Sequence, residues 1–429
     1  MHNIFHNKIA IIGLGYVGLP LALAFGEKFN TTGFDINKNR IKELQNRNDS
    51  NLLSKRQSFY KSKKLKFSSN PQDLRNSNIF IITVPTPVKK NKKPELSYLY
   101  SASKIVANNL KKKDLVIYES TVYPGLTEEE CVPLLEKYSN LEFNKDFFVG
   151  YSPERISPGD NKDLANISKV VSGSNSKITN DVYNLYKKII KAKVYKATSI
   201  KVAEASKAIE NAQRDINISF MNEISLICSR LGINTSEVLA AANTKWNFLN
   251  FKPGLVGGHC ISVDPYYLTY KAKKLKYSPK VILSGRSIND KMGYYVASTL
   301  LKKLKKNNLK FSQCLVGILG VTFKENCNDL RESKVLDIIK TLQKAKVKLQ
   351  VYDPIVSVKD FNKYYPNLKI KKIHNKLDAL IVAVSHKEFL KLNYTKIKNM
   401  LKNENSIVMD VKSIFNDKRI KNKFDYWSL

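Results

Sequence analysis

Cysteine is scarce in this chain. Five cysteines occur among 429 residues, scattered from Cys131 to Cys327, and no two have the C-x-x-C spacing. An odd number of widely spaced cysteines argues against a disulfide framework and a zinc site, so we expect no bound metal. The same pattern is typical of a reducing compartment and predicts a cytoplasmic protein.

Long uninterrupted apolar runs are absent as well. The stretch 9–25 raises the question of a signal peptide or membrane helix, but three glycines and a proline interrupt it and Glu27 follows it. No A-x-A-like cleavage site follows either. The composition, 43% hydrophobic and 26% charged, is that of a soluble globular protein. We therefore expect no membrane partner.

Acidic residues are few relative to basic ones. Asp and Glu number 37 against 73 Lys and Arg, which gives a formal net charge of +36. Such a surface attracts nucleic acid, anionic membrane or a polyanionic small ligand. The lysine clusters are dispersed, at residues 61–66, 89–93, 111–113 and 302–306, and carry no interleaved aromatic residues. We therefore expect solvated faces and no nucleic-acid partner.

The N-terminal residues have the pattern of a dinucleotide-binding unit. Residues 8–12 and 31–35 are short strands around the helix-like residues 19–29, and the second strand ends at Asp35. In the GxGxxG turn between them, the glycines allow the tight turn, the approach of a pyrophosphate and helix packing. Asp35 favours NAD as the cofactor, while Arg40, a second candidate contact, leaves NADP open. The alternative interpretation of the whole pattern is a glycine-rich unit that binds no ligand. The turn contains Gly13, Gly15, Tyr16, Val17 and Gly18.

Further parallel strands are predicted at residues 79–84, 115–122 and 147–155. Ligands of open α/β sheets bind beyond the carboxyl ends of the strands, so the residues there are candidate cofactor contacts. The third strand delivers Glu154 and Arg155, for which a surface ion pair is the alternative interpretation. The candidate cofactor contacts are Thr83, Pro85, Thr86, Ser120 and Thr121.

A long helix is predicted over residues 199–231, ended by Gly232. One face of this helix carries Glu204, Lys207 and Asn211. These residues are either part of a ligand site or, as the alternative interpretation, a solvated Glu–Lys pair on a surface helix. Patterns at residues 315–324, 349–354 and 379–384 predict a second α/β unit. The fold class is therefore α/β, with two doubly wound Rossmann-like domains joined by a long central helix and a small helical domain. We divide the chain at residues 1–198, 199–300 and 301–429, with the helix as a dimerisation surface.

Cys260 stands in a glycine-rich loop between Pro253 and Pro265. Glycines that close together predict a sharp turn or a close ligand approach. A cysteine there is a candidate nucleophile, and a tight turn with a merely buried cysteine is the other interpretation.

Five blocks occur in order: IGLGYVGLP at 12–20, ESTVYPG at 119–125, SPER at 152–155, GGHC with DP at 257–265, and FK with DLRES at 323–333. Together they resemble the UDP-glucose, GDP-mannose and UDP-N-acetylhexosamine 6-dehydrogenase family over essentially the full length. The segments SPERISPGD and LVGGHCISVDPYYLTYKA are most similar to the UDP-N-acetylglucosamine branch of Vi-antigen and O-antigen synthesis.

This resemblance implies a four-electron oxidation of a UDP-sugar at C6, with two NAD reduced and a thioester on Cys260, in a homodimer that serves surface-polysaccharide synthesis. By similarity, Lys207 and Asn211 would stabilise an oxyanion, and Asp264, Glu154 and Thr121 would order or activate water. Arg331 would contact the cofactor. His259 would lower the pKa of Cys260 or face solvent or phosphate. The implied substrate contacts are Glu154, Arg155, Lys207, Asn211, Gly257, Gly258, His259, Phe323 and Lys324.

Two positions depart from the UDP-glucose members. Where those members carry a second glutamate, this chain has Pro158, and near their arginine it has Lys245 and Trp246. Both departures weaken a UDP-glucose assignment and favour the N-acetylhexosamine branch.

Overall fold

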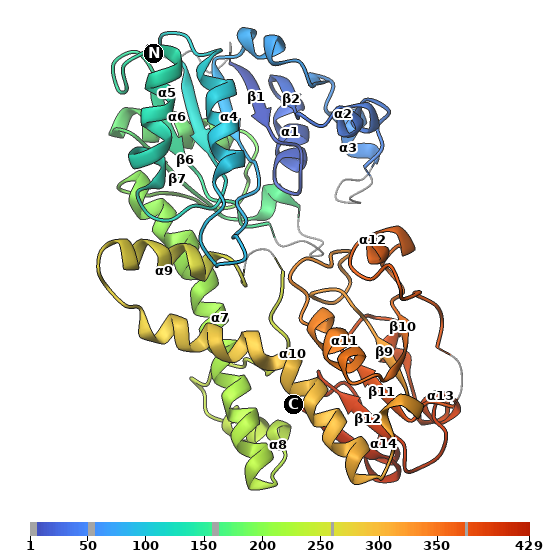
Figure 1. Cartoon of the computed structure of the whole chain (residues 1–429). Coiled ribbons are helices and arrows are strands. Elements are labelled where there is room, and N and C mark those ends of the chain that lie inside the picture. The colour runs from blue at the N-terminus through green and yellow to red at the C-terminus, as the bar shows by residue number, and fades with distance from the viewer. Residues whose placement is uncertain (1–6, 50–55, 157–162, 259–260, 374–375) are drawn as a thin grey trace. The chain divides into compact units, whose positions relative to one another are not determined.

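The computed structural model describes residues 7–49, 56–156, 163–258, 261–373 and 376–429. The chain folds into two compact units, one of residues 1–210 and 266–278, the other of residues 211–265 and 279–429 (Figure 1). His259, Cys260 and Pro158, singled out in the sequence, lie outside the described residues.

The first unit is built on an eight-stranded sheet. Its strand order is β3-β2-β1-β4-β5-β6-β7-β8, and all pairs are parallel except β6 with β7. The first six strands have the order 3-2-1-4-5-6 of a dinucleotide-binding sheet. The strands are β1 (Lys8–Ile12), β2 (Asn30–Phe34), β3 (Leu65–Ser68), β4 (Ile79–Ile82), β5 (Leu115–Tyr118), β6 (Phe148–Tyr151), β7 (Lys169–Gly173) and β8 (Val194–Lys196).

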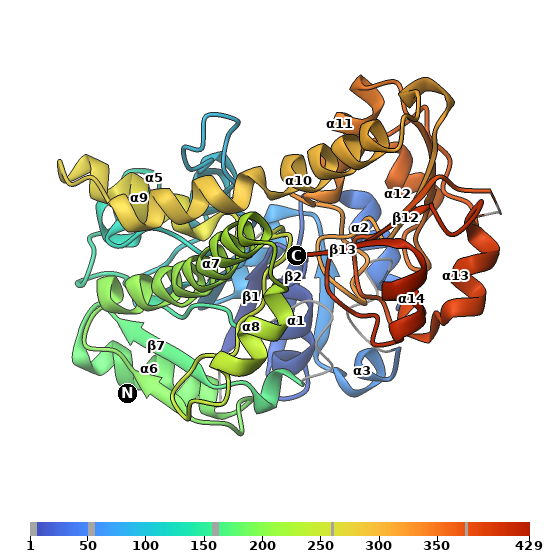
Figure 2. The same cartoon turned by 90° about the horizontal axis from the view of Figure 1, so that it is seen from below.

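Helices cover both faces of this sheet. On one face, α1 and α6 share an apolar core with β1, in which the rings of Phe25 and Tyr186 meet edge to face. On the other face, α4 and α5 pack together (Figures 1 and 2). Strands β4 and β5 are buried throughout, as expected of parallel strands covered on both sides. The helices are α1 (Gly18–Gly26), α2 (Lys38–Gln45), α3 (Arg56–Lys61), α4 (Ser97–Ala107), α5 (Val132–Ser139) and α6 (Ser176–Lys187).

The second unit contains a five-stranded, fully parallel sheet of order β10-β9-β11-β12-β13. This is the other common doubly wound order, 2-1-3-4-5. Helices α10 and α11 pack on one face, and α13 and α14 on the other. The strands are β9 (Leu315–Leu319), β10 (Lys348–Tyr352), β11 (Ala379–Val382), β12 (Ile407–Asp410) and β13 (Asp425–Ser428). The helices are α8 (Thr235–Ala242), α10 (Lys280–Lys306), α11 (Val335–Lys344), α12 (Val358–Asn362), α13 (Tyr394–Met400) and α14 (Lys418–Lys423).

Two helices belong to both units: α7 (Ile200–Leu231) and α9 (Asp264–Lys274). Gly232 follows α7 with φ of 69°, the left-handed conformation predicted for the residue that ends it. The α/β class with two doubly wound sheets and a long helix is therefore confirmed. The sequence analysis did not predict β7, the strand that reverses direction in the first sheet.

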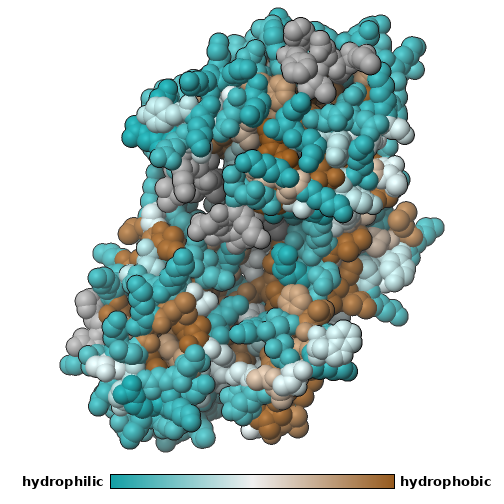
Figure 3. Space-filling model, turned by 180° about the vertical axis from the view of Figure 1, so that it is seen from behind, coloured by the Kyte–Doolittle hydropathy of each residue, from teal (hydrophilic) through white to brown (hydrophobic). Residues whose placement is uncertain are grey.

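The surface is largely hydrophilic on the face drawn in Figure 3, where hydrophobic side chains gather in separate patches. In the described part of the chain, no helix combines the length and apolarity needed to cross a membrane.

Candidate active site

The glycine-rich turn after β1 is tied to the acid at the end of β2. Gly13 has φ of 94°, and its N–H donates to the carbonyl of Phe34 at 2.8 Å. The Asp35 carboxylate accepts the N–H of Leu14 at 2.9 Å and that of Asn37 at 2.9 Å. The acid predicted to bind the ribose therefore also fixes the turn predicted to receive the pyrophosphate. Tyr16 and Val17 complete that turn directly before α1.

Gly18 and Gly15 lack side chains for different reasons. A β-carbon on Gly18 would lie 1.8 Å from the carbonyl oxygen of Gly13 and 2.4 Å from Thr83 Oγ1, so helix packing requires glycine. A β-carbon on Gly15 would meet no protein atom within 4 Å. The protein's own packing therefore does not demand glycine at Gly15, whereas a pyrophosphate at the N-terminus of α1 would.

The Arg40 side chain is buried beneath this turn. Its Nε donates to the carbonyl of Leu14 at 3.2 Å, and its two terminal nitrogens pair with Glu43 at 3.0 Å and Asp49 at 2.8 Å. The guanidinium supports the turn from inside and is occupied by these partners. This arrangement answers the question that Arg40 raised in the sequence, because it favours NAD over a cofactor with a 2′-phosphate.

Hydroxyl groups join the carboxyl ends of the neighbouring strands. Thr83 Oγ1 after β4 donates to the carbonyl of Gly13 at 2.7 Å, and Ser120 Oγ after β5 donates to Val84 at 2.6 Å. Thr86 Oγ1 donates to the carbonyl of Thr121 at 2.7 Å. These predicted cofactor contacts thus gather at the edge that also carries the glycine turn, and Pro85 lies exposed among them.

Beyond β6, Glu154 is 6% exposed and meets the buried ammonium of Lys169, whose Nζ lies 2.9 Å from Glu154 Oε2 and 2.6 Å from Glu119 Oε2. The sequence analysis singled out Glu154 but gave no role to Glu119 or Lys169. A glutamate directly after a buried strand, and a lysine opening the apolar run KVVSG, were the available signals.

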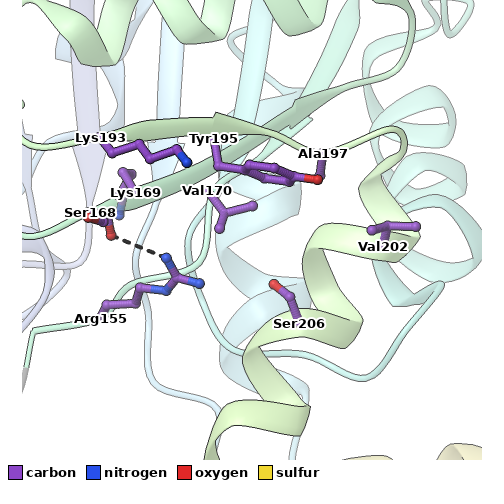
Figure 4. A pocket seen from close by; sticks show the side chains of 9 residues that line it. All are labelled: Arg155, Ser168, Lys169, Val170, Lys193, Tyr195, Ala197, Val202 and Ser206. Carbon is purple, nitrogen blue, oxygen red and sulfur yellow. Dashed lines mark hydrogen bonds between the residues drawn. The ribbon is translucent and has the colours of Figure 1, made fainter.

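The Arg155 guanidinium faces a surface pocket of about 270 Å³ (Figure 4). It pairs with Glu210 on α7, and its Nη1 donates to the carbonyl of Ser168 at 3.4 Å. The side chain predicted to contact substrate is therefore held against α7. The pocket is lined by Arg155, Ser168, Lys169, Val170, Lys193, Tyr195, Ala197, Val202 and Ser206.

Three residues of α7 predicted to share a face are all buried. Glu204 accepts the N–H groups of Gly125 and Thr127, at 3.0 Å for Thr127, and burial raises the pKa of this carboxyl to about 7. It thus holds the turn after β5 instead of pairing with Lys207. Lys207 has no hydrogen-bond or ion-pair partner among the residues that the structure describes.

One turn further along α7, Asn211 Nδ2 donates to Asp264 Oδ2 at 2.5 Å. Asp264 opens α9, and both side chains are less than 5% exposed. Two residues 53 positions apart in sequence, both given a catalytic role by the resemblance, are therefore in direct contact.

The start of the cysteine loop is held by α7 as well. The Asn222 amide makes two bonds to the backbone of Gly254, accepting its N–H at 2.8 Å and donating to its carbonyl at 3.0 Å. Gly257 and Gly258 pack against Phe323: a β-carbon on Gly257 would lie 3.0 Å from the β-carbon of Phe323, and one on Gly258 would lie 2.6 Å from its ring. These two glycines therefore lie against Phe323, a predicted substrate contact, and leave no room for side chains at their positions.

The segment after β9 carries the other predicted ligand contacts. Phe323 N–H donates to the Asp329 carbonyl at 3.0 Å, and the Arg331 guanidinium holds the Asp329 carboxylate through Nε at 3.0 Å and Nη2 at 2.6 Å. The carbonyl of Lys324 accepts Thr322 Oγ1 at 2.9 Å. Phe323, Lys324 and Arg331 therefore lie on one internally bonded loop.

Comparison with known families identifies three consecutive matches to the UDP-glucose/GDP-mannose dehydrogenase family. Residues 7–190 match its NAD-binding domain, residues 201–291 its central domain and residues 317–417 its UDP-binding domain. The glycine turn, the α7 residues and the loop after β9 fall in these three matches in that order.

Individual relatives align over nearly the whole chain. A UDP-N-acetyl-D-glucosamine 6-dehydrogenase of Pseudomonas aeruginosa is 50% identical over 412 residues, which cover 96% of this chain and 97% of that protein. One of Salmonella typhi is 49% identical over 418 residues, 96% of this chain and 98% of that protein. The solved structure of a UDP-D-ManNAc dehydrogenase from Pyrococcus horikoshii superimposes with a TM-score of 0.88 at 31% identity, covering 98% of both chains. The chain therefore belongs to the UDP-glucose/GDP-mannose dehydrogenase family.

Proposed function

We propose that this chain is an NAD-dependent UDP-N-acetyl-D-glucosamine or UDP-N-acetylgalactosamine 6-dehydrogenase, which converts the C6 alcohol of the sugar to a carboxylate for surface-polysaccharide synthesis. The observation that carries the proposal is the near-50% identity, over almost the entire chain, to two UDP-N-acetyl-D-glucosamine 6-dehydrogenases. The ordered NAD-binding, central and UDP-binding domains supply both ligand sites.

The overall reaction removes four electrons from C6. Alcohol, one water and two NAD⁺ give carboxylate, two NADH and three protons. When bound, NAD⁺ supplies the two-electron acceptor for each of the two oxidations. The turn with Gly13, Gly15 and Gly18 would hold its pyrophosphate and Asp35 its ribose. The hydroxyl residues at the strand ends and Arg331 would complete the contacts.

Cys260 is the proposed nucleophile. Its thiolate would add to the C6 aldehyde left by the first oxidation, and water would later release the acid from the thioester formed by the second. The thiolate leaves as the carbon–oxygen bond to water forms. This covalent link keeps the reactive aldehyde on the protein between the two oxidations.

The residues of α7 are suited to the charge that develops at C6. Lys207 is a buried ammonium without a partner among the described residues, which is the arrangement expected of a group that stabilises an oxyanion. Asn211 would act beside it, oriented by its bond to Asp264. Asp264, Glu154 and Thr121 would order or activate the water. The UDP-sugar would contact Gly257, Gly258, His259, Phe323 and Lys324.

Two other functions compete with this one. The same machinery could oxidise UDP-glucose or UDP-N-acetylmannosamine, the substrate type named for the Pyrococcus horikoshii structure. Pro158 and Lys245–Trp246 argue against UDP-glucose, and the higher identity to the glucosamine enzymes argues against mannosamine. A non-catalytic basic nucleotide-binding module is the third function, and it leaves the buried Lys207 and the Asn211–Asp264 pair unexplained.

Initial rates of NAD⁺ reduction with a panel of UDP-sugars test the proposal. We expect the highest kcat/KM with UDP-N-acetylglucosamine or UDP-N-acetylgalactosamine, and two NADH formed for each sugar consumed. UDP-glucose as the best substrate would contradict the substrate assignment. A protein that binds the nucleotides but forms no NADH would be the non-catalytic module.

We also propose a cytoplasmic homodimer, divided into domains at residues 1–198, 199–300 and 301–429. The buried free thiols of Cys131, Cys228, Cys314 and Cys327 support the compartment. Phe220, Ile227 and Leu231 of α7 support the dimer, because they are 53%, 45% and 66% exposed at a spacing that places them on one helix face. We expect sedimentation to give twice the chain mass, and Phe220→Glu to reduce it; a monomeric wild type would contradict the dimer.

A further inference from the structure

Lys169 is the most deeply buried ammonium near the proposed site. Its side chain is 1% exposed, at the start of β7, the strand that runs antiparallel to β6. Because β7 reverses direction, it brings Lys169 to the edge where β5 and β6 deliver Glu119 and Glu154. The ammonium lies between the two carboxylates, 2.6 Å from one and 2.9 Å from the other.

Each carboxylate is held on its other side as well. Glu154 Oε1 accepts the N–H groups of Arg155 and Ile156, both at 2.6 Å, while its Oε2 accepts from Lys169. Glu119 Oε1 accepts the hydroxyl of Tyr186 on α6, whose ring also lies 5.4 Å from the ammonium. Three donors therefore fix the orientation of Glu154, and only Lys169 among them is a side chain.

We propose that Lys169 is a positioning residue for the sugar oxidation, which holds the Glu154 carboxylate in one orientation and in its charged form, while Glu119 and Tyr186 hold Lys169. This inference rests on the proposed function, in which Glu154 orders or activates water. A buried ion pair keeps its charges only where further hydrogen bonds replace the water that both groups have lost, and Glu119 provides such a bond to Lys169.

The ionisation of the three groups agrees with this arrangement. Burial alone would raise the pKa of Glu154, but the charge of Lys169 and the hydrogen bonds to the carboxylate hold it below its usual value. Burial and the charge of Glu154 raise the pKa of Glu119 to about 7, against the opposing effect of Lys169. Glu154 is therefore the carboxylate that stays charged, and Glu119 is the one that can carry a proton near neutral pH.

Within the described residues, few other charges face this cluster. Tyr186 approaches from α6, and burial together with Glu119 raises its pKa, so it remains a neutral donor. From α7, Glu210 is paired with the guanidinium of Arg155. The carboxylate of Glu154 is therefore governed chiefly by Lys169.

The test compares Lys169→Met with Lys193→Met, a matched control at an exposed lysine that lines the pocket in Figure 4. For Lys169→Met we expect kcat to fall at least about tenfold, and the acidic limb of the kcat/KM profile to move about one pH unit upward, because Glu154 loses its cation. NAD binding should stay within about twofold, since the glycine turn is unchanged. Lys193→Met should behave as wild type.

A double variant separates positioning from folding. Lys169→Met with Glu119→Gln removes one positive and one negative group together, so the net charge of the cluster with Glu119 ionised is unchanged and only Glu154 is left without its cation. We expect a higher unfolding temperature than for Lys169→Met alone, but the same upward-shifted pH profile. Wild-type kcat and an unmoved profile in either Lys169 variant would overturn the proposal, because the cluster would then be purely structural.

Glu119→Gln decides the matter if neither lysine variant folds. The Glu119 carboxyl already carries a proton where Glu154 titrates, so the acidic limb should keep its position while Lys169 still holds Glu154. An acidic limb moved upward would overturn the proposal, because Glu119 and not Lys169 would then govern the ionisation of Glu154. Failure of the wild-type protein to reduce NAD⁺ with any UDP-sugar would instead contradict the proposed function itself.

Discussion

Replacing Cys260 with serine should lower the rate of acid formation by at least about a thousandfold. A hydroxyl ionises far less readily than a thiol, so the attack on the C6 aldehyde loses its reactive anion. Binding of NAD and of UDP should stay within about threefold, because the proposed contacts of both ligands are with other residues, in the glycine turn and in the loop after β9. NADH fluorescence measures turnover, and calorimetric titration measures binding.

Cys314→Ser is the matched control for this variant. Cys314 is a buried free cysteine, and its Sγ already donates to the carbonyl of Lys310, a bond that a serine hydroxyl can make. It lies at the start of β9, away from the proposed nucleophile in the sequence, and its variant should turn over as wild type. If Cys260→Ser also forms acid at the wild-type rate, the covalent route is wrong.

Replacing two glycines of the turn with alanine should change two different properties: the stability of the fold at Gly18 and the affinity for NAD at Gly15. Gly18→Ala should cost about 2 kcal/mol or more in the free energy of unfolding, because its β-carbon would overlap the carbonyl oxygen of Gly13. Gly15→Ala should leave that free energy within about 0.5 kcal/mol, because its β-carbon meets no protein atom. Gly15→Ala should nevertheless weaken NAD binding about 100-fold, or about 2.7 kcal/mol, since the methyl takes the space of the pyrophosphate.

Denaturant unfolding and NAD titration of both variants measure these effects. The free energy of unfolding of Gly15→Ala serves as the control, because weak NAD binding by a fully stable variant cannot be due to damaged packing. Wild-type NAD affinity in Gly15→Ala would mean that the pyrophosphate does not approach this turn. A fully stable Gly18→Ala would contradict the packing described for α1.

Local sequence patterns were sufficient for most of the fold. The GxGxxG turn with Asp35 predicts the first sheet because its spacing reflects covalent limits on a turn between strand and helix. The proline-free stretch over residues 199–231 likewise predicts α7. The antiparallel strand β7 was missed, because a short apolar run does not reveal the direction in which it pairs.

Contacts between residues far apart in the chain are the main feature that the sequence did not predict. Lys169 and Glu119 are 50 residues apart, and no local spacing predicts that they meet. Nor does local spacing predict the partners of Arg40, a candidate cofactor contact whose side chain bonds to Leu14, Glu43 and Asp49.

Lys207 and Asn211 stand one turn apart on α7, yet the first belongs to one folding unit and the second to the other. Their separation along the axis is about 6 Å, set by the helical rise and by nothing else. Because the helix is continuous through both residues, the two groups proposed to stabilise the oxyanion form one rigid pair whose spacing does not depend on any other part of the fold.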